Sequence, residues 1–150
     1  MAKIDINKHI KIVEKIPLVK TLSSYQLQQV LRCGNLGSEP FGYTLFRQGD
    51  KSLGFYILLS GELVVLDGNT EIGHIKPVDI VGEMGMISNQ PRSATIKVTK
   101  EATLINVPKM QFDALLKGDV DLAARVFRNM LDSLIGKLLT ANEKIKKGVI

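Results

Sequence analysis

The chain has 150 residues, of which 45% are hydrophobic and 23% charged, and its formal net charge is +5. This length and apolar content suit one globular domain and exclude a disordered or low-complexity chain. Aromatic residues make up only 5% and tryptophan is absent, so the core must be mainly aliphatic. The excess of 20 Lys and Arg over 15 Asp and Glu is mild, and no dense basic cluster predicts a nucleic-acid surface.

One cysteine and two histidines limit the chemistry that the chain can carry. Cys33 alone cannot form an internal disulfide or hold zinc or an iron–sulfur cluster, so we expect no metal. The sequence contains no nucleophile elbow and no P-loop, and we expect no catalytic residues and no enzyme. The first five residues lack the apolar stretch of a signal peptide, and no run approaches the length of a membrane span. We therefore expect a cytoplasmic location.

Apolar residues recur at helical spacing over residues 6–34. Pro17 interrupts this pattern, which predicts two helices with a break near that proline. Ser23 and Ser24 are suited to cap the second helix. We assign residues 1–38 to N-terminal helices.

Short apolar runs separated by turn residues follow, from about Tyr43 to Val107. Asp67-Gly68-Asn69-Thr70 between two such runs predicts a β-hairpin. Several short strands with no helix between them before residue 82 favour an antiparallel sheet over βαβ units. We expect an α+β fold, with an antiparallel β-roll over 40–108 that forms a double-stranded, jelly-roll-like barrel, flanked by N-terminal helices and a long C-terminal helix. The strands are predicted at 43–46, 55–59, 63–66, 72–75, 94–98 and 103–107.

Helical spacing returns from residue 109 to the end of the chain. It predicts a short helix that stops near Gly118 and a long helix that starts at Asp119 or Asp121. Two apolar stripes run along the long helix, and two such faces need two surfaces to cover them. One stripe is a heptad seam formed by Phe127, Leu131, Leu134, Leu138, Ala141 and Ile145, and its neighbour consists of Leu122, Val126, Met130, Ile135 and Leu139. We expect a homodimer through residues 127–145, and the alternative that the seam folds back on the β-roll stays open.

The segment Val81–Thr95, with the sequence VGEMGMISNQPRSAT, carries the chemistry. Gly82 and Gly85 at the start of a helical turn let backbone N–H groups approach an anion closely. Arg92 offers a phosphate a planar, permanently charged, bidentate partner. Glu83 only accepts hydrogen bonds when ionised, so its place is beside a sugar hydroxyl rather than beside a phosphate. Together these residues predict a receptor for a small sugar phosphate.

The same segment resembles the phosphate-binding cassette of cyclic-nucleotide-binding domains, the family of the protein kinase A regulatory subunits and the bacterial catabolite activator protein. The nine-position offset from Glu83 to Arg92 matches the spacing in the kinase regulatory subunits. Two glycine turns, within Phe46–Asp50 and Phe55–Leu63, resemble the family's other signature turns. The resemblance covers nearly the whole chain, so we expect one such domain over 1–150, with the cassette at 81–95 and the C-terminal helices at 109–150.

The resemblance implies that Glu83 binds the ribose 2′-hydroxyl and Arg92 the cyclic phosphate. It places backbone groups of Gly82, Met84, Ser93 and Ala94 in the same pocket. Ser93 stands where a Thr would favour cyclic GMP, so cyclic AMP is the preferred ligand and cyclic GMP the alternative.

Two further regions follow from the resemblance. Lys137 and Leu138 of the long helix are expected near the base. Val78 stands where the family usually has a Gly, and Ile80-Val81 replaces its aromatic residue. This departure leaves the sugar-side wall undetermined.

The expected function is a regulatory module that binds a cyclic nucleotide and changes the conformation of its C-terminal helix, which an effector protein or domain then senses. The alternative is a degenerate member that serves as a dimerisation or interaction scaffold without nucleotide. The intact pair of Glu83 and Arg92 argues against the scaffold. A helix-turn-helix would have to follow the long helix, and the sequence ends at Ile150, so we expect no nucleic-acid partner within this chain.

Overall fold

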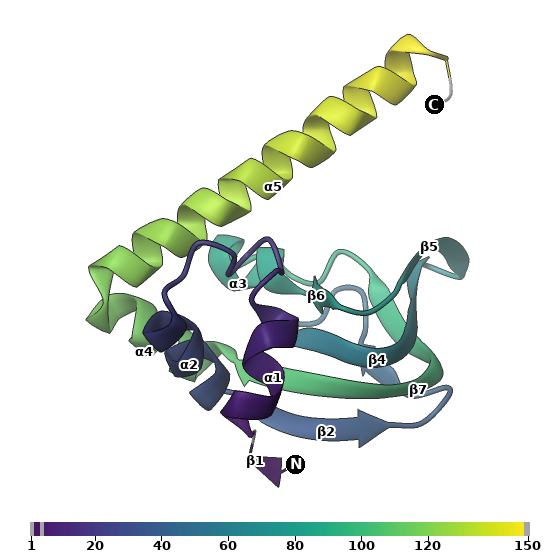
Figure 1. The fold of residues 1–150 in the computed structure, drawn as a ribbon. Coiled ribbons are helices and arrows are strands. Elements are labelled where there is room, and N and C mark those ends of the chain that lie inside the picture. The colour runs from purple at the N-terminus through teal and green to yellow at the C-terminus, as the bar shows by residue number, and fades with distance from the viewer. Residues whose placement is uncertain (1, 4, 149–150) are drawn as a thin grey trace.

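A computed structural model of the chain describes residues 2–3 and 5–148, with strands in the middle and helices toward both ends (Figure 1). The seven strands form one antiparallel sheet in the order β1-β2-β7-β4-β5, with β3 on β7 and β6 on β4. Among the described residues this path stays open, so the sheet does not close into the barrel that the sequence predicts, because no pairing joins β1 to β5. The predicted α+β class, an antiparallel sheet with flanking helices, is confirmed. The elements are β1 (Ala2–Lys3), α1 (Ile6–Val13), α2 (Ser24–Arg32), β2 (Asn35–Glu39), β3 (Thr44–Phe46), β4 (Gly54–Asp67), β5 (Thr70–Ile75), β6 (Asp79–Val81), α3 (Glu83–Ser88), β7 (Thr95–Pro108), α4 (Lys109–Gly118) and α5 (Val120–Lys146).

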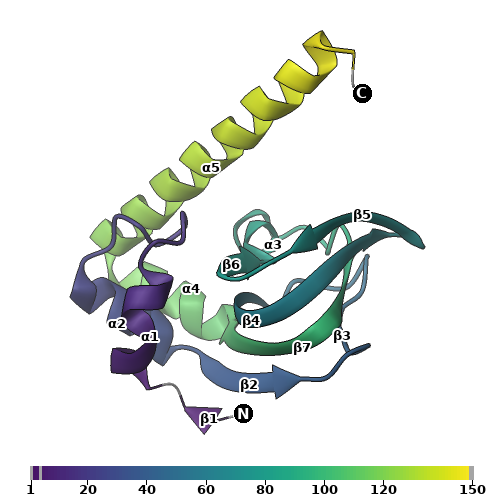
Figure 2. The same cartoon turned by 45° about the vertical axis from the view of Figure 1, so that its right-hand side comes forward.

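Strands β4 and β7 run through 14 residues each and form the centre of the sheet. The sequence predicts two short strands in place of each one, because residues such as Ser60-Gly61 are typical of turns. In the structure these residues form bulges, with register shifts between Leu58 and Leu63. Gly61 has a φ of 91°, and a Cβ on it would lie 2.7 Å from the Cα of Ala102. Only glycine permits this approach, and both strands curve without ending (Figure 2).

Strand β2 overturns part of the predicted N-terminal block. Helices throughout residues 1–38 were expected, but β2 pairs with β7 along its whole length, from Asn35 to Glu39. The sequence Asn-Leu-Gly-Ser-Glu contains no β-branched residue, so its local preference gives no strand signal. The free edge of β7 supplies the pairing instead. The outer ends of the predicted blocks, at residue 1 and residues 149–150, lie outside the described residues.

The predicted helix ends agree with the structure more closely. Ser23 is the N-cap of α2, since its hydroxyl accepts a hydrogen bond from the backbone N–H of Gln26 at 3.1 Å. Asp119 is the N-cap of α5, and its carboxylate accepts from the N–H of Leu122 at 3.0 Å. α4 ends at Gly118, as expected.

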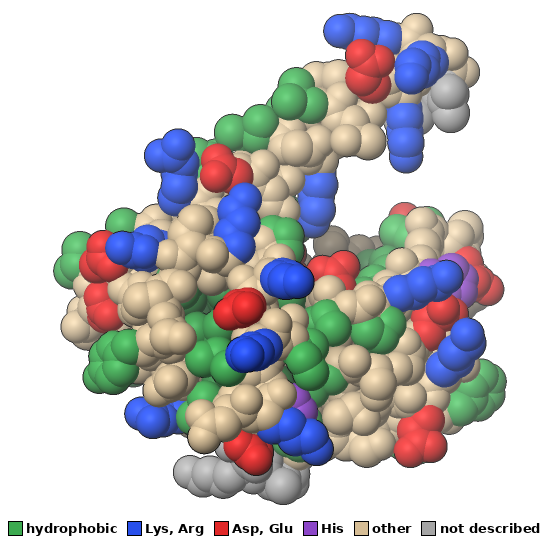
Figure 3. Space-filling view, viewed as in Figure 1, with side chains coloured by type: hydrophobic (Ala, Val, Ile, Leu, Met, Phe, Trp, Pro, Cys, Tyr) green, Lys and Arg blue, Asp and Glu red, His purple; other side chains and the backbone are tan. Residues whose placement is uncertain are grey.

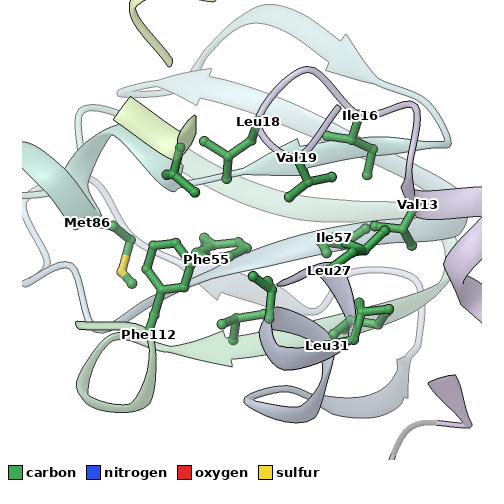
Figure 4. Close-up of a cluster of buried hydrophobic side chains, with 14 of the residues drawn as sticks. Val13, Ile16, Leu18, Val19, Leu27, Leu31, Phe55, Ile57, Met86 and Phe112 are labelled. Carbon is green, nitrogen blue, oxygen red and sulfur yellow. The ribbon is translucent and has the colours of Figure 1, made fainter. Parts of the chain in front are cut away.

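Two clusters of buried side chains join the layers. In the first, shown in Figure 4, side chains of the N-terminal segment, the sheet, α3 and α4 converge, and Phe55 meets Phe112 edge to face with ring centroids 5.0 Å apart. Met86 of α3 belongs to this cluster, which anchors α3 in the same core as α4 and α5. The second cluster fills the roll and consists of Leu58, Leu63, Val81, Ile96, Val98, Ala102 and Leu104.

Helix α5 is anchored only along its first half and stands away from the sheet along its second half (Figures 1 and 2). Leu122 and Val126 are fully buried, whereas Leu138 is 61% exposed. Four residues of the predicted heptad seam are exposed, namely Phe127, Leu131, Leu138 and Ile145. The neighbouring stripe is therefore the one that packs on the domain at its first half. In the seam, Leu134 packs against the first cluster, whereas the four exposed residues stay uncovered in this structure.

Candidate functional site

A cavity of about 540 Å³ lies between the roll, α3 and α5. Every cassette residue that the sequence analysis assigned to the site lines this cavity, although these residues come from two separate stretches of the cassette. They are Gly82, Glu83, Met84, Arg92, Ser93 and Ala94. The fold thus brings the predicted set together.

Gly82 connects β6 to α3 and shapes the cavity wall. Its φ is 84°, a left-handed conformation that favours glycine. A Cβ at this position would collide with the guanidinium of Arg92 and lie 3.4 Å from the ring of Phe46. Glycine is therefore needed at this position for two reasons: it permits the backbone turn, and it leaves room for the guanidinium of Arg92. Helix α3, which follows, has only six residues, so it offers an anion no strong helix dipole.

The backbone of Arg92 is held by the glycine turn between β3 and β4. The N–H of Arg92 donates to the carbonyl of Asp50 at 2.8 Å, and the N–H of Gly49 donates to the carbonyl of Arg92 at 2.8 Å. Within the turn, the Asp50 carboxylate accepts from the N–H of Arg47 at 2.9 Å, and Gly49 has a φ of 89°. The first glycine turn noted in the sequence thus holds the backbone of Arg92 in place.

The guanidinium of Arg92 is buried, with 7% of the residue exposed. Its two terminal nitrogens donate to the carbonyls of Gly82 at 3.0 Å and Gly54 at 2.6 Å, and its Cζ lies 3.9 Å from the centroid of the Phe46 ring. Among the described residues nothing accepts a hydrogen bond from its buried Nε. A guanidinium has five N–H donors, so most of its donor capacity remains for an anion. Burial lowers the pKa of Arg92, while Tyr56, Asp50 and Glu83 raise it, and an arginine stays charged throughout.

Glu83 is the acidic group of the cavity. Burial raises the pKa of its carboxyl above the ordinary value, and Asp79 adds to this rise. Its own backbone N–H, Lys137 and Arg92 act in the opposite direction. A half-desolvated carboxylate beside two cations is a strong acceptor for a hydroxyl hydrogen bond and a poor neighbour for a second anion.

Sequence reasoning missed part of the wall. Val65 and Ile75 supply apolar lining from two strands, and only their place in the folded roll reveals this; Ile80, which the sequence analysis associated with the sugar-side wall, lines the cavity as well. Ser52 also lines the cavity, and its hydroxyl donates to the carbonyl of Gln90 at 2.8 Å. The cavity is therefore lined by apolar strand residues as well as by the charged side chains of Glu83, Arg92 and Lys137.

The prediction for the long helix holds for one of its two residues. Lys137 lines the cavity, whereas Leu138 does not and is exposed. A second cavity of about 350 Å³ continues beneath α5 and shares Glu83, Met84 and Lys137 with the first. Figure 3 shows the hollow between the α5 rod and the roll, with side chains of both charges at its edges.

Other kinds of site find no support in the described part of the chain. Its residues include no group of three or more His, Cys, Asp or Glu that could hold a metal ion. No helix in the described ranges is long and apolar enough to cross a lipid bilayer.

Comparisons with known proteins identify the family of the chain. The sequence model of the cyclic nucleotide-binding domain matches residues 40–119. The chain is 28% identical over 106 residues to a cAMP-dependent protein kinase regulatory subunit of Colletotrichum orbiculare, covering 69% of this chain and 27% of that protein. It therefore spans less than a third of the length of this relative.

Two solved structures are similar. The regulatory domain of Toxoplasma gondii PKA with cAMP superposes with a TM-score of 0.71 at 27% identity, covering 87% of this chain and 50% of the other. The Thermus thermophilus catabolite activator protein superposes with a TM-score of 0.72 at 22% identity, covering 87% and 62%, which supports the fold. Because the family match spans more than half of the sequence and includes both the glycine turns and the cassette, the chain belongs to the cyclic nucleotide-binding domain family.

Proposed function

We propose that this chain is a regulatory module that binds a cyclic nucleotide in the cavity between the roll, α3 and α5. The cyclic phosphate lies against Arg92 and the neighbouring backbone N–H groups of the cassette, and the ribose 2′-hydroxyl donates to Glu83. Binding is the whole chemistry, without a catalytic step. A cytoplasmic location stays a prediction.

The observation that carries this proposal is the state of Arg92. A buried cation without a bound carboxylate is costly, and here two backbone carbonyls hold it while none of the residues that the structure describes accepts a hydrogen bond from its Nε. An anion in the cavity would satisfy these donors. The carboxylate of Glu83 shares the same cavity, which matches a ligand with one anionic and one hydroxyl edge.

Cyclic AMP is the ligand we propose first. The curated relative from Colletotrichum orbiculare is named as a cAMP-dependent kinase subunit, and the similar Toxoplasma gondii structure contains cAMP. Ser93 lines the cavity and is exposed, so its hydroxyl is free to reach a ligand.

The proposed response is a movement of the second half of α5 toward the cavity. Ile135, Leu138 and Leu139 are exposed there, and the second cavity separates this part of the helix from the roll. A ligand that contacts both surfaces would favour a closed arrangement through its differential affinity for it. A partner protein or domain would respond to the position of α5.

A second candidate function, a dimerisation scaffold, is supported by the exposed heptad seam. Phe127 and Leu131 are 47% and 54% exposed, and with Leu138 and Ile145 they form an apolar stripe at coiled-coil spacing. We propose that a second copy of this chain covers the stripe. This assembly is compatible with nucleotide binding and is the sole function only if no nucleotide binds.

Thermal unfolding with cyclic AMP, cyclic GMP and non-cyclic 5′-AMP separates the two functions. A ligand at a hundred times its Kd adds about 2.7 kcal/mol, which corresponds to a rise in Tm of about 5 to 11 °C at this chain length. We expect this rise with a cyclic nucleotide. If neither cyclic nucleotide shifts Tm at millimolar concentration, the scaffold remains as the function.

Light scattering tests the assembly. We expect a particle of twice the 16.5 kDa chain mass, and Leu138→Asp should reduce it to the single-chain mass. A 16.5 kDa particle for the unmodified protein at micromolar concentration would exclude the homodimer.

A further inference from the structure

Lys137 occupies a distinct place on α5. Between Met130 and Ala141 it is the only Lys or Arg in the sequence. Its side chain lines both the 540 Å³ cavity and the 350 Å³ cavity beneath the helix. Of the α5 residues that border the smaller cavity, Lys137 is also the one that reaches the larger cavity.

Glu83 is the acidic group that Lys137 shares these cavities with. Both residues line the same two cavities, so the helix and the carboxylate border one continuous space. The other charged groups around Glu83 are Asp79 on β6, which repels its charge, and Arg92, whose guanidinium already donates to two carbonyls. Lys137 lowers the pKa of Glu83 against the rise caused by burial.

We propose that Lys137 is a positioning residue: its ammonium attracts the Glu83 carboxylate across the cavity, keeps that carboxylate ionised for the ribose hydroxyl, and draws α5 toward the ligand site. The role of Glu83 toward the ribose rests on the proposed function. The electrostatic link itself exists in the free protein and can be measured there.

The link has consequences for pH dependence. Only the ionised carboxylate is acceptor-only, so the ribose contact weakens as pH falls through the pKa of Glu83. Burial and Asp79 raise the pKa of Glu83, and Lys137 lowers it. Without the Lys137 charge this pKa is therefore higher, and the loss of affinity on acidification begins at higher pH. Replacing Lys137 by Arg keeps the charge and should restore the original profile.

An NMR titration of the Glu83 side-chain carboxyl carbon in ligand-free protein tests the link directly. The resonance is assigned by its absence in Glu83→Gln. We expect the midpoint to move to higher pH in Lys137→Met, to return in Lys137→Arg, and to stay unchanged in Lys144→Met, which removes an exposed lysine two turns further along the same helix. Equal midpoints in the unmodified protein and Lys137→Met would overturn the proposal.

Calorimetric titration with cyclic AMP at several pH values supplies the second readout. Lys137→Met should bind roughly two- to fivefold more weakly at pH 7, the effect of one exposed charge pair, with a larger loss at lower pH. If the affinity profiles of Lys137→Met and the unmodified protein superimpose, the proposal is wrong even though the protein binds nucleotide. If nothing binds while the NMR midpoints shift as expected, the proposed function fails and the Lys137–Glu83 link stands.

Discussion

Gly82→Ala should damage this protein more than an equally strained glycine substitution elsewhere. An alanine at φ 84° is strained, at a cost of about 1 to 2 kcal/mol. Its Cβ would also collide with the terminal nitrogen of Arg92 and lie 3.3 Å from Cζ, so the guanidinium must move. The displaced group loses its hydrogen bond to the Gly82 carbonyl, and a bond from a charged donor contributes about 1.5 to 3 kcal/mol. The expected total is about 2.5 to 5 kcal/mol.

Gly42→Ala is the matched control. Gly42 has a φ of 88°, but no atom lies within 4 Å of the position that its Cβ would take, so only the backbone strain remains. Urea denaturation should therefore show a loss of about 1 to 2 kcal/mol for Gly42→Ala and the larger loss for Gly82→Ala. In an Arg92→Ala background the extra cost at Gly82 should disappear, because the group it collides with is gone. Equal losses at the two glycines would refute the packing of Arg92 against Gly82.

Two further outcomes follow from the site and its support. Burial raises the pKa of Glu83, so the folded state binds the proton of this carboxyl more tightly than the unfolded state does. The free energy of unfolding therefore falls as pH rises through the folded pKa. Glu83→Gln should raise Tm at pH 8 and lose this advantage toward pH 4. A Tm difference that is constant across this range would contradict the assignment. Asn129→Ala should lower the free energy of unfolding by about 1 to 3 kcal/mol, because the buried amide that donates to the Leu18 carbonyl and the Thr21 hydroxyl is lost. Thr140→Ala, which removes an exposed hydroxyl, is the control in urea denaturation, and equal losses would show that the Asn129 contacts add nothing.

Local signals in the sequence predicted the features that depend on a few neighbouring residues. Ser23 and Asp119 have side chains that cap a helix within three residues, and both caps are present. Asp67 ends β4 and Thr70 begins β5, as the hairpin signal indicated. The cassette segment was recognised in the same way, from a fixed spacing of residue types, and its residues line one cavity, while their roles toward a ligand stay predictions.

Features that depend on distant contacts were not predictable. β2 has no strand signal of its own and exists because β7 offers an edge. Gly61 reads as a turn but lies in a bulge, since its backbone approaches Ala102 far along the chain. The two stripes of α5 have similar composition, and only the packing of Leu122 and Val126 decides which one faces the domain.

The affinity of Arg92→Ala for cyclic AMP tests most directly whether Arg92 forms the anion site. Losing a buried charged partner should weaken binding by about 2 kcal/mol or more, which is about thirtyfold in Kd. Arg92→Lys, which keeps the charge but not the planar fork, should fall in between. Arg47→Ala, which removes an exposed arginine from the adjacent turn, should bind like the unmodified protein.

Each variant is first shown to fold by circular dichroism, because Arg92 also bonds to the carbonyls of Gly54 and Gly82. In calorimetry, the account predicts tight binding by the unmodified protein and by Arg47→Ala, and at least thirtyfold weaker binding by folded Arg92→Ala. Equal affinity of folded Arg92→Ala and the unmodified protein would contradict it.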